Sequence, residues 1–146
     1  VLHQTKSFMD DVLAHLWEND VCSFDNVGTK IFYYQFLSLH DEIKFYLLSQ
    51  MIKYAGGLGY APEADEVLRL VDMLKHSDFS GATLGGCEIF LAQNSLWVVR
   101  EIKNKFVLSK SQWAEFVLKH QEYRRLELPY KLRLALVNEW MNQNRS

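Results

Sequence analysis

The stretch that decides the fold is Gly81-Ala-Thr-Leu-Gly-Gly-Cys-Glu-Ile-Phe90, which leads on to Leu96-Trp-Val-Val-Arg-Glu101. Residues 87–92 and 96–99 are rich in β-branched, aromatic and other apolar side chains, and the polar residues 93–95 lie between them. Two such runs joined by a short polar turn predict a β-hairpin. The glycines at 81, 85 and 86 allow the backbone to turn into that hairpin without a side-chain clash.

A second hairpin is predicted nearer the start of the sequence. Val21-Cys-Ser-Phe24 and Thr29-Lys-Ile-Phe-Tyr-Tyr34 have the composition of strands, and Asp25-Asn-Val-Gly28 supplies turn residues between them. We therefore expect a short strand, a turn and a second strand in this region.

Four other segments carry the apolar spacing of amphipathic helices. They run from Phe8 to Trp17, with Ser7 as the expected N-cap, from Asp41 to Tyr54, from Pro62 to Leu74 and from Ser111 to His120. Glycines 56, 57 and 59 are expected to end the second helix. Residues 130–136 alternate apolar with polar side chains, which leaves both strand and helix open for that segment. The sequence thus predicts an α+β fold, a mainly helical domain with two small β-hairpins.

Size and composition indicate a folded protein with a single core. The chain has 146 residues, of which 49% are hydrophobic and 23% charged, as is usual for globular domains. No apolar run reaches the roughly 20 residues of a membrane span, and the first residues lack the apolar stretch of a signal peptide. We expect no membrane association and a cytoplasmic location. Cys22 and Cys87 are isolated in the sequence, so we expect reduced thiols that act as small hydrophobic residues.

Charge is divided unevenly along the sequence, although the net charge is only −2. Residues 1–99 carry 6 Lys and Arg against 13 Asp and Glu, a net charge of −7, whereas residues 100–133 carry 9 against 4, a net charge of +5. Such an asymmetry is typical of a polyanion-binding site, and a solvated helical surface has the same pattern. On charge alone, both interpretations remain open.

The sequence predicts no catalytic residue and no metal site. The glycines at 56–59 lack the preceding strand and the following Lys-Ser/Thr of a phosphate-binding loop, and a helix C-cap explains them better. The five histidines never occur as a pair four residues apart, and neither cysteine lies near a second metal ligand. The many aromatic residues are expected in the core, except that whichever of Tyr33 and Tyr34 faces outward is a candidate platform for stacking on unpaired bases.

Several motifs resemble the region that follows the catalytic domain in tRNA(Ile)-lysidine synthetases, most closely the alpha-proteobacterial forms. The matching positions are Tyr60-Ala-Pro62, Thr83-Leu-Gly-Gly86, Cys87 and Arg100-Glu101, with a looser match around Leu128-Pro129. The resemblance covers residues 1–105 and implies an accessory substrate-binding domain there, followed by a basic helical extension over residues 106–146 that packs on the same core. The catalytic PP-loop domain of that family, with its ATP-binding and metal-associated residues, has no counterpart in this sequence.

In that family, the PP-loop domain uses ATP and Mg to ligate lysine to the wobble cytidine of the CAU anticodon. The resemblance therefore implies a tRNA-recognition part that is itself non-catalytic and holds no cofactor. Its expected partners are tRNA(Ile) and the PP-loop domain of the same polypeptide. The residues expected to contact RNA phosphates are Arg100, Lys103, Lys105, Arg124, Arg125, Lys131 and Arg133. The alternative is a stand-alone protein–protein interaction domain without an RNA role.

Overall fold

The computed structural model describes residues 2–103, 108–124 and 126–143, and side chains from residue 8 onward within these ranges. Its elements, in chain order, are α1 (Leu2–Asn19), β1 (Cys22–Phe24), β2 (Gly28–Phe32), α2 (Tyr33–Leu37), α3 (Asp41–Gly56), α4 (Ala64–Leu74), β3 (Ala82–Leu84), β4 (Cys87–Ala92), β5 (Ser95–Arg100), α5 (Lys110–Lys119), a 3-10 turn (Gln121–Tyr123) and α6 (Tyr130–Gln143). The predicted α+β class is confirmed.

The two predicted hairpins exist, and the structure joins them into one antiparallel sheet with the strand order β1-β2-β5-β4-β3. Strand β2 pairs with β5 from Gly28 opposite Val99 to Phe32 opposite Ser95. The short strand β3, which the sequence did not predict, adds to the edge of β4 through a two-residue turn at Gly85 and Gly86. Both turn glycines have positive φ, which confirms the predicted role of these residues in turning the chain.

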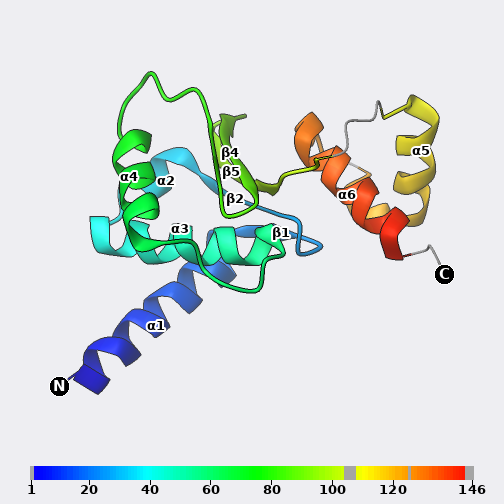
Figure 1. Cartoon of the computed structure of the whole chain (residues 1–146). Coiled ribbons are helices and arrows are strands. Elements are labelled where there is room, and N and C mark those ends of the chain that lie inside the picture. Colours follow the sequence, from blue (N-terminus) through cyan, green and yellow to red (C-terminus); the bar gives the residue numbers. More distant parts are fainter. Residues whose placement is uncertain (1, 104–107, 125, 144–146) are drawn as a thin grey trace.

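Helices cover both faces of this sheet, so the molecule has three layers (Figure 1). We call α1–α4 the first layer and α5 with α6 the second layer. Strand β5 contributes Leu96 and Val98 to the core under the first layer, and Trp97 and Val99 to the core under the second. Since side chains alternate across a strand, the unbroken apolar run of β5 buries residues on both faces.

Several element boundaries differ from the prediction. Helix α1 begins at Leu2, so Ser7 lies inside the helix and is not its N-cap. The second predicted strand ends at Phe32, because β5 begins at Ser95 and no partner strand continues beyond it, and Tyr33 instead starts α2. The N-cap of α5 is Ser109, and Ser111 lies within the helix. The segment from residue 130, for which strand and helix were both open, is helical.

The predicted end of α3 is confirmed. The helix ends at Gly56, and Gly57 adopts the left-handed conformation with φ of 74°. This conformation suits glycine, because a side chain would be strained there. The boundary predicted between the two parts of the chain, near residue 105, lies outside the described residues.

Candidate nucleic-acid interface

Five of the predicted RNA-contacting residues have described positions: Arg100, Lys103, Arg124, Lys131 and Arg133. Lys105 and Arg125 lie outside the described residues. The five differ in their surroundings, and these surroundings decide how much of each side chain is available to an external phosphate.

Arg100 lies at the end of β5 and joins three segments of the chain. Its Nε donates a hydrogen bond to the Ala55 carbonyl oxygen at 2.8 Å, and its Nη2 donates to the Asn26 carbonyl oxygen at 2.8 Å. Its Nη1 forms an ion pair with the Glu139 carboxylate at 3.2 Å. Arg100 thus connects α3, the β1–β2 turn and α6. Only some of its N–H groups remain available to bind other groups.

Lys131 lies in the first turn of α6 and is held from two sides. Its ammonium group is 3.5 Å from the Glu88 carboxylate and 5.2 Å from the ring centroid of Phe90. Half of the side chain remains exposed. Ion pairs at such exposure contribute little to stability, so Glu88 offsets the charge of Lys131 without fixing it in place.

Arg133 is the residue most closely surrounded by aromatic rings. Its guanidinium carbon lies 5.8 Å from the ring centroid of Trp113 on α5 and 5.7 Å from that of Tyr130 on α6. The guanidinium plane favours such positions because ring faces carry negative charge density. Its Nε is buried and has no hydrogen-bond partner among the described residues.

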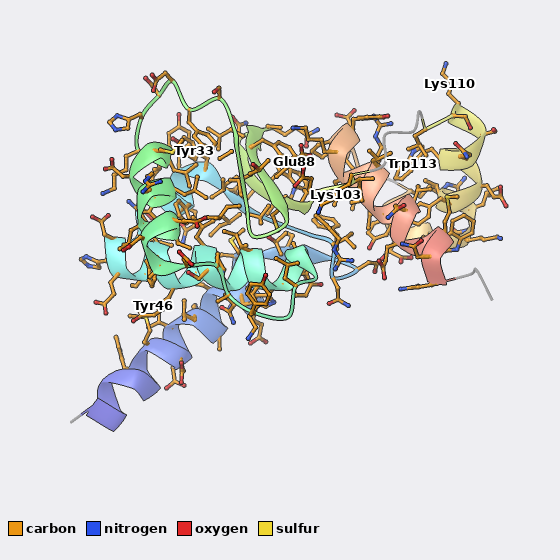
Figure 2. The ribbon with its side chains drawn as sticks, viewed as in Figure 1. Tyr33, Tyr46, Glu88, Lys103, Lys110 and Trp113 are labelled. Atoms are coloured by element: carbon orange, nitrogen blue, oxygen red, sulfur yellow. The ribbon has the colours of Figure 1, made fainter. Side chains whose placement is uncertain are left out.

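Lys103 and Arg124 are exposed, and no carboxylate of a described residue lies within ion-pair distance of either. Lys110, at the start of α5, has the same properties. Lys103 and Lys110 lie on either side of α6 in Figure 2, where Trp113 lies between α5 and α6. These three cations are the ones whose charge is most available to solvent and to phosphates.

The structure does not bring the predicted cations into one compact patch. Arg100 is the last residue of β5 and Lys103 follows it, outside the helices of the second layer. Lys131 and Arg133 lie at the start of α6, whereas Arg100 contacts Glu139 nearer its end. Eight residues of helix separate positions 131 and 139, which corresponds to about 12 Å. Near the end of α6, the Lys119 ammonium group of α5 lies over the Trp140 ring, 4.9 Å from its centroid.

Charge counting missed one cationic group outside the basic tract. Lys53, in the last turn of α3, lines a pocket together with Arg100 and the aromatic residues Trp17 and Tyr54. The available sequence signal was the Lys53-Tyr54 pair directly before the glycines that end the helix. Trp17 belonged to the apolar stripe of α1, so its partial exposure was not foreseen.

Of the two tyrosines considered as an exposed platform, Tyr34 faces outward. Its side chain is 76% exposed, whereas the Tyr33 hydroxyl donates a hydrogen bond to the Leu74 carbonyl oxygen. Phe32 and Tyr60, which were expected in the core, are also largely exposed. Tyr34 lies in α2 and Tyr60 in the loop between α3 and α4, both in the first layer, whereas Phe32 is the last residue of β2.

The buried thiol of Cys87 has the properties of a core residue. Burial raises its pKa to about 12, so it carries its proton at neutral pH and is a poor nucleophile. Among the described residues, no group of three His, Cys, Asp or Glu side chains is arranged to hold a metal ion.

Comparisons of the chain with models of known protein families, with curated proteins and with solved structures found no match. None of the helices in the described ranges is long and apolar enough to cross a membrane.

Proposed function

We propose that this chain is the accessory tRNA-recognition part of a lysidine-forming ligase of the tRNA(Ile)-lysidine synthetase type. It holds tRNA(Ile) through its second layer, while the ligase chemistry, with ATP and Mg, belongs to a PP-loop domain of the same polypeptide. The proposal rests on the sequence motifs given above and on the character of the second layer.

The observation that carries the proposal is the contact of cationic groups with aromatic rings on α5 and α6. The Arg133 guanidinium lies near the rings of Trp113 and Tyr130. Lys103, Lys110 and Arg124 are exposed. Lysine and arginine side chains bind phosphates, and aromatic rings stack on bases that are not paired.

Arg100 and Lys131 have a smaller part in this proposal than the sequence suggested. Arg100 gives three of its donors to acceptors within the chain, and Lys131 has Glu88 beside it. The main phosphate contacts are therefore assigned to Lys103, Arg124 and Arg133, with Lys110 added. Contacts of this kind fix the position of an RNA and carry little sequence information, so selection of tRNA(Ile) also needs RNA shape.

The test is a fluorescence-anisotropy titration of the 146-residue chain with labelled tRNA(Ile) carrying a CAU anticodon, repeated across a range of KCl concentrations. We expect an affinity that falls steeply with salt, because phosphate neutralisation releases counterions. The charge reversals Lys103→Glu and Arg124→Glu should each weaken binding and lower the salt slope by about 1.

The matched control is Arg69→Glu. Arg69 is an exposed cation on α4, in the first layer, and its reversal changes the net charge by the same amount. It should leave affinity nearly unchanged. Undetectable binding at low salt, or equal losses for all three reversals, would refute the proposal.

A further inference from the structure

A second cationic and aromatic feature lies outside the basic tract. It is a pocket of about 620 Å³ where α1, the β1–β2 turn, the C-terminal end of α3 and the end of β5 meet. Its lining residues are Trp17, Asn26, Gln50, Lys53, Tyr54, Gly57, Gly59 and Arg100. The pocket is a shallow depression that is wide open to solvent, so an occupant would keep part of its surface in water. No carboxylate is among these lining residues, which favours an anionic or neutral occupant over a cation.

One wall of the pocket is aromatic. The rings of Trp17 and Tyr54 pack edge to face, with centroids 5.3 Å apart and planes at 67°. The Tyr54 hydroxyl accepts a hydrogen bond from the Asn26 backbone N–H at 3.0 Å, which ties the ring to the β1–β2 turn. Both rings are only partly buried, so part of their surface is open to a planar ligand in a fixed position.

Two cationic side chains, Lys53 and Arg100, also line the pocket, and Arg100 is paired with the Glu139 carboxylate. A guanidinium group has five N–H donors, and Arg100 uses one on each nitrogen for Ala55, Glu139 and Asn26. Two donors remain, on a group whose position is fixed by three contacts. Lys53 is exposed, and no carboxylate of the described part of the chain lies within ion-pair distance of it.

The loop after α3 brings backbone close to the Arg100 guanidinium. Gly57 has positive φ, and a Cβ atom built on it would lie 2.9 Å from the guanidinium carbon of Arg100. The absence of a side chain at Gly57 therefore leaves the guanidinium accessible at the pocket wall. Gln50 and Asn26 add amide groups that can both donate and accept hydrogen bonds.

We propose that this pocket binds one unpaired nucleotide of an RNA. The base lies against Trp17 and Tyr54, with its edge near the amides of Gln50 and Asn26, and its phosphate lies at Lys53 and Arg100. A nucleotide joins a planar aromatic base to an anionic phosphate, and the pocket lining contains both aromatic rings and cationic side chains. The inference rests on the proposed RNA-binding function and assigns to the protein a second contact with unpaired RNA, separate from the phosphate contacts of the second layer.

The test compares two RNAs with the native chain. One is a labelled single-stranded oligoribonucleotide of eight residues, and the other is a blunt-ended RNA duplex of eight base pairs. The pocket requires an unpaired base, so Lys53→Glu should weaken single-strand binding about tenfold and duplex binding less than twofold. Trp17→Leu should act in the same direction, because base stacking on an aromatic ring changes affinity by about 5- to 150-fold.

Two further variants keep the result interpretable. Gln50→Ala changes an exposed side chain on α3 and tests the pocket if Trp17→Leu proves unstable, and it should also weaken only single-strand binding. Arg69→Glu, on the first layer outside the pocket, is the matched charge reversal for Lys53→Glu and should affect neither RNA selectively. Circular dichroism spectra of each variant establish that it is folded.

A competition arm separates RNA from a free nucleotide. A 5′-mononucleotide shares the base and phosphate, so we expect it to displace the oligoribonucleotide only weakly, because it lacks the flanking contacts. If the mononucleotide binds as tightly as the oligoribonucleotide and displaces it completely, flanking nucleotides contribute nothing. That result would overturn the RNA assignment. Native binding of tRNA and duplex with no effect of Lys53→Glu, Trp17→Leu or Gln50→Ala would overturn the pocket and leave the proposed function standing. Failure of the native chain to bind any RNA would instead refute the proposed function itself.

Discussion

At the scale of single residues, Arg100 has the largest structural role among the predicted contacts. It connects the end of α3, the β1–β2 turn and α6, which lie far apart in the sequence. Two of its acceptors are backbone carbonyl oxygens that no strand ladder would otherwise satisfy. Hydrogen bonds from a charged donor are among the stronger ones in proteins, so this one side chain helps to hold the two helical layers to the same end of the sheet.

Cys87 provides a prediction at the same scale. The pKa of the Cys87 thiol is about 12 in the folded protein, whereas in the unfolded chain it has the ordinary cysteine value of 9.0. The contribution of this residue to the free energy of unfolding is therefore complete below pH 9 and declines as the pH rises from 9 toward 12. Between pH 7.0 and pH 10.5, the free energy of unfolding should fall by about 2 kcal/mol less for Cys87→Ala than for the native chain. Urea denaturation at both pH values measures this difference.

The control for this measurement is Cys22→Ala, since Cys22 is exposed. Its alkaline loss of stability should equal that of the native chain. Burial also raises the pKa of Tyr123, so the native chain and both variants should share a further decline at high pH, and only the difference between them reports on Cys87. Equal losses for Cys87→Ala and the native chain would contradict the prediction.

At the scale of elements, the sequence predicted the existence of most helices and strands but not all of their limits. The end of α3 was predictable because Gly57 has a conformation that suits glycine. The start of α2 was not, because it depends on where β5 begins, some 60 residues later in the chain. Local composition cannot report on a partner strand that is distant in sequence.

Helix α6 shows a second limit of sequence patterns. Residues 130–136 alternate apolar and polar residues, as a strand does, yet the buried residues of α6 are Leu132, Ala135, Leu136 and Val137. These follow helical spacing, which an alternating stretch of seven residues conceals. The unbroken apolar run of Leu96 to Val99 was the available signal that the sheet is covered on both faces.

The first turn of α5 gives a prediction at this scale. The Ser109 hydroxyl accepts a hydrogen bond from the Gln112 backbone N–H at 3.1 Å, and the Gln112 side chain accepts one from the Ser109 backbone N–H at 3.0 Å. This reciprocal pair is a capping box. Ser109→Ala should lower the free energy of unfolding by about 1 kcal/mol, measured by urea denaturation.

Ser111 supplies the matched control in the same turn. Its hydroxyl contacts that of Ser109 at 3.1 Å, but it caps no backbone group of the helix. Ser111→Ala should therefore change stability by less than about 0.5 kcal/mol. A loss for Ser111→Ala as large as that for Ser109→Ala would show that the hydroxyl pair, and not the cap, stabilises this turn.

At the scale of the whole molecule, two apolar cores share one sheet. The charge asymmetry of the sequence predicted that the basic tract differs from the rest of the chain, but it gave no information on which cations have partners. Glu88 and Glu139, which neutralise Lys131 and Arg100, come from distant elements. The sequence thus predicted that basic residues are concentrated in this part of the chain. Which of them form ion pairs depends on how α6 packs against the sheet, which the sequence does not show.

The shared sheet predicts how the protein unfolds. Because β5 supplies Leu96 and Val98 to one core and Trp97 and Val99 to the other, loss of either core exposes apolar surface of the same strand. Urea unfolding followed by tryptophan fluorescence and by far-ultraviolet circular dichroism should therefore give one coincident transition. Leu132→Ala, which removes a fully buried side chain of the second layer, should lower both midpoints together and cost about 2–5 kcal/mol.

Two separated transitions, with Leu132→Ala shifting only one of them, would contradict this prediction. Leu118→Ala is a suitable control, because Leu118 is also an apolar residue of the second layer but is 71% exposed. Its midpoints should remain close to those of the native chain.

The position of β5 at the centre of the sheet also bears on how the protein is made. On the ribosome, β2 is complete at Phe32, but its inner edge has no partner until the chain has been extended to Arg100. At synthesis rates of about 5–20 residues per second, this interval lasts on the order of 3–14 s. Throughout that time the nascent chain presents an open strand edge, and the helices that emerge in this interval, α2, α3 and α4, have only β1 and β2 on which to condense.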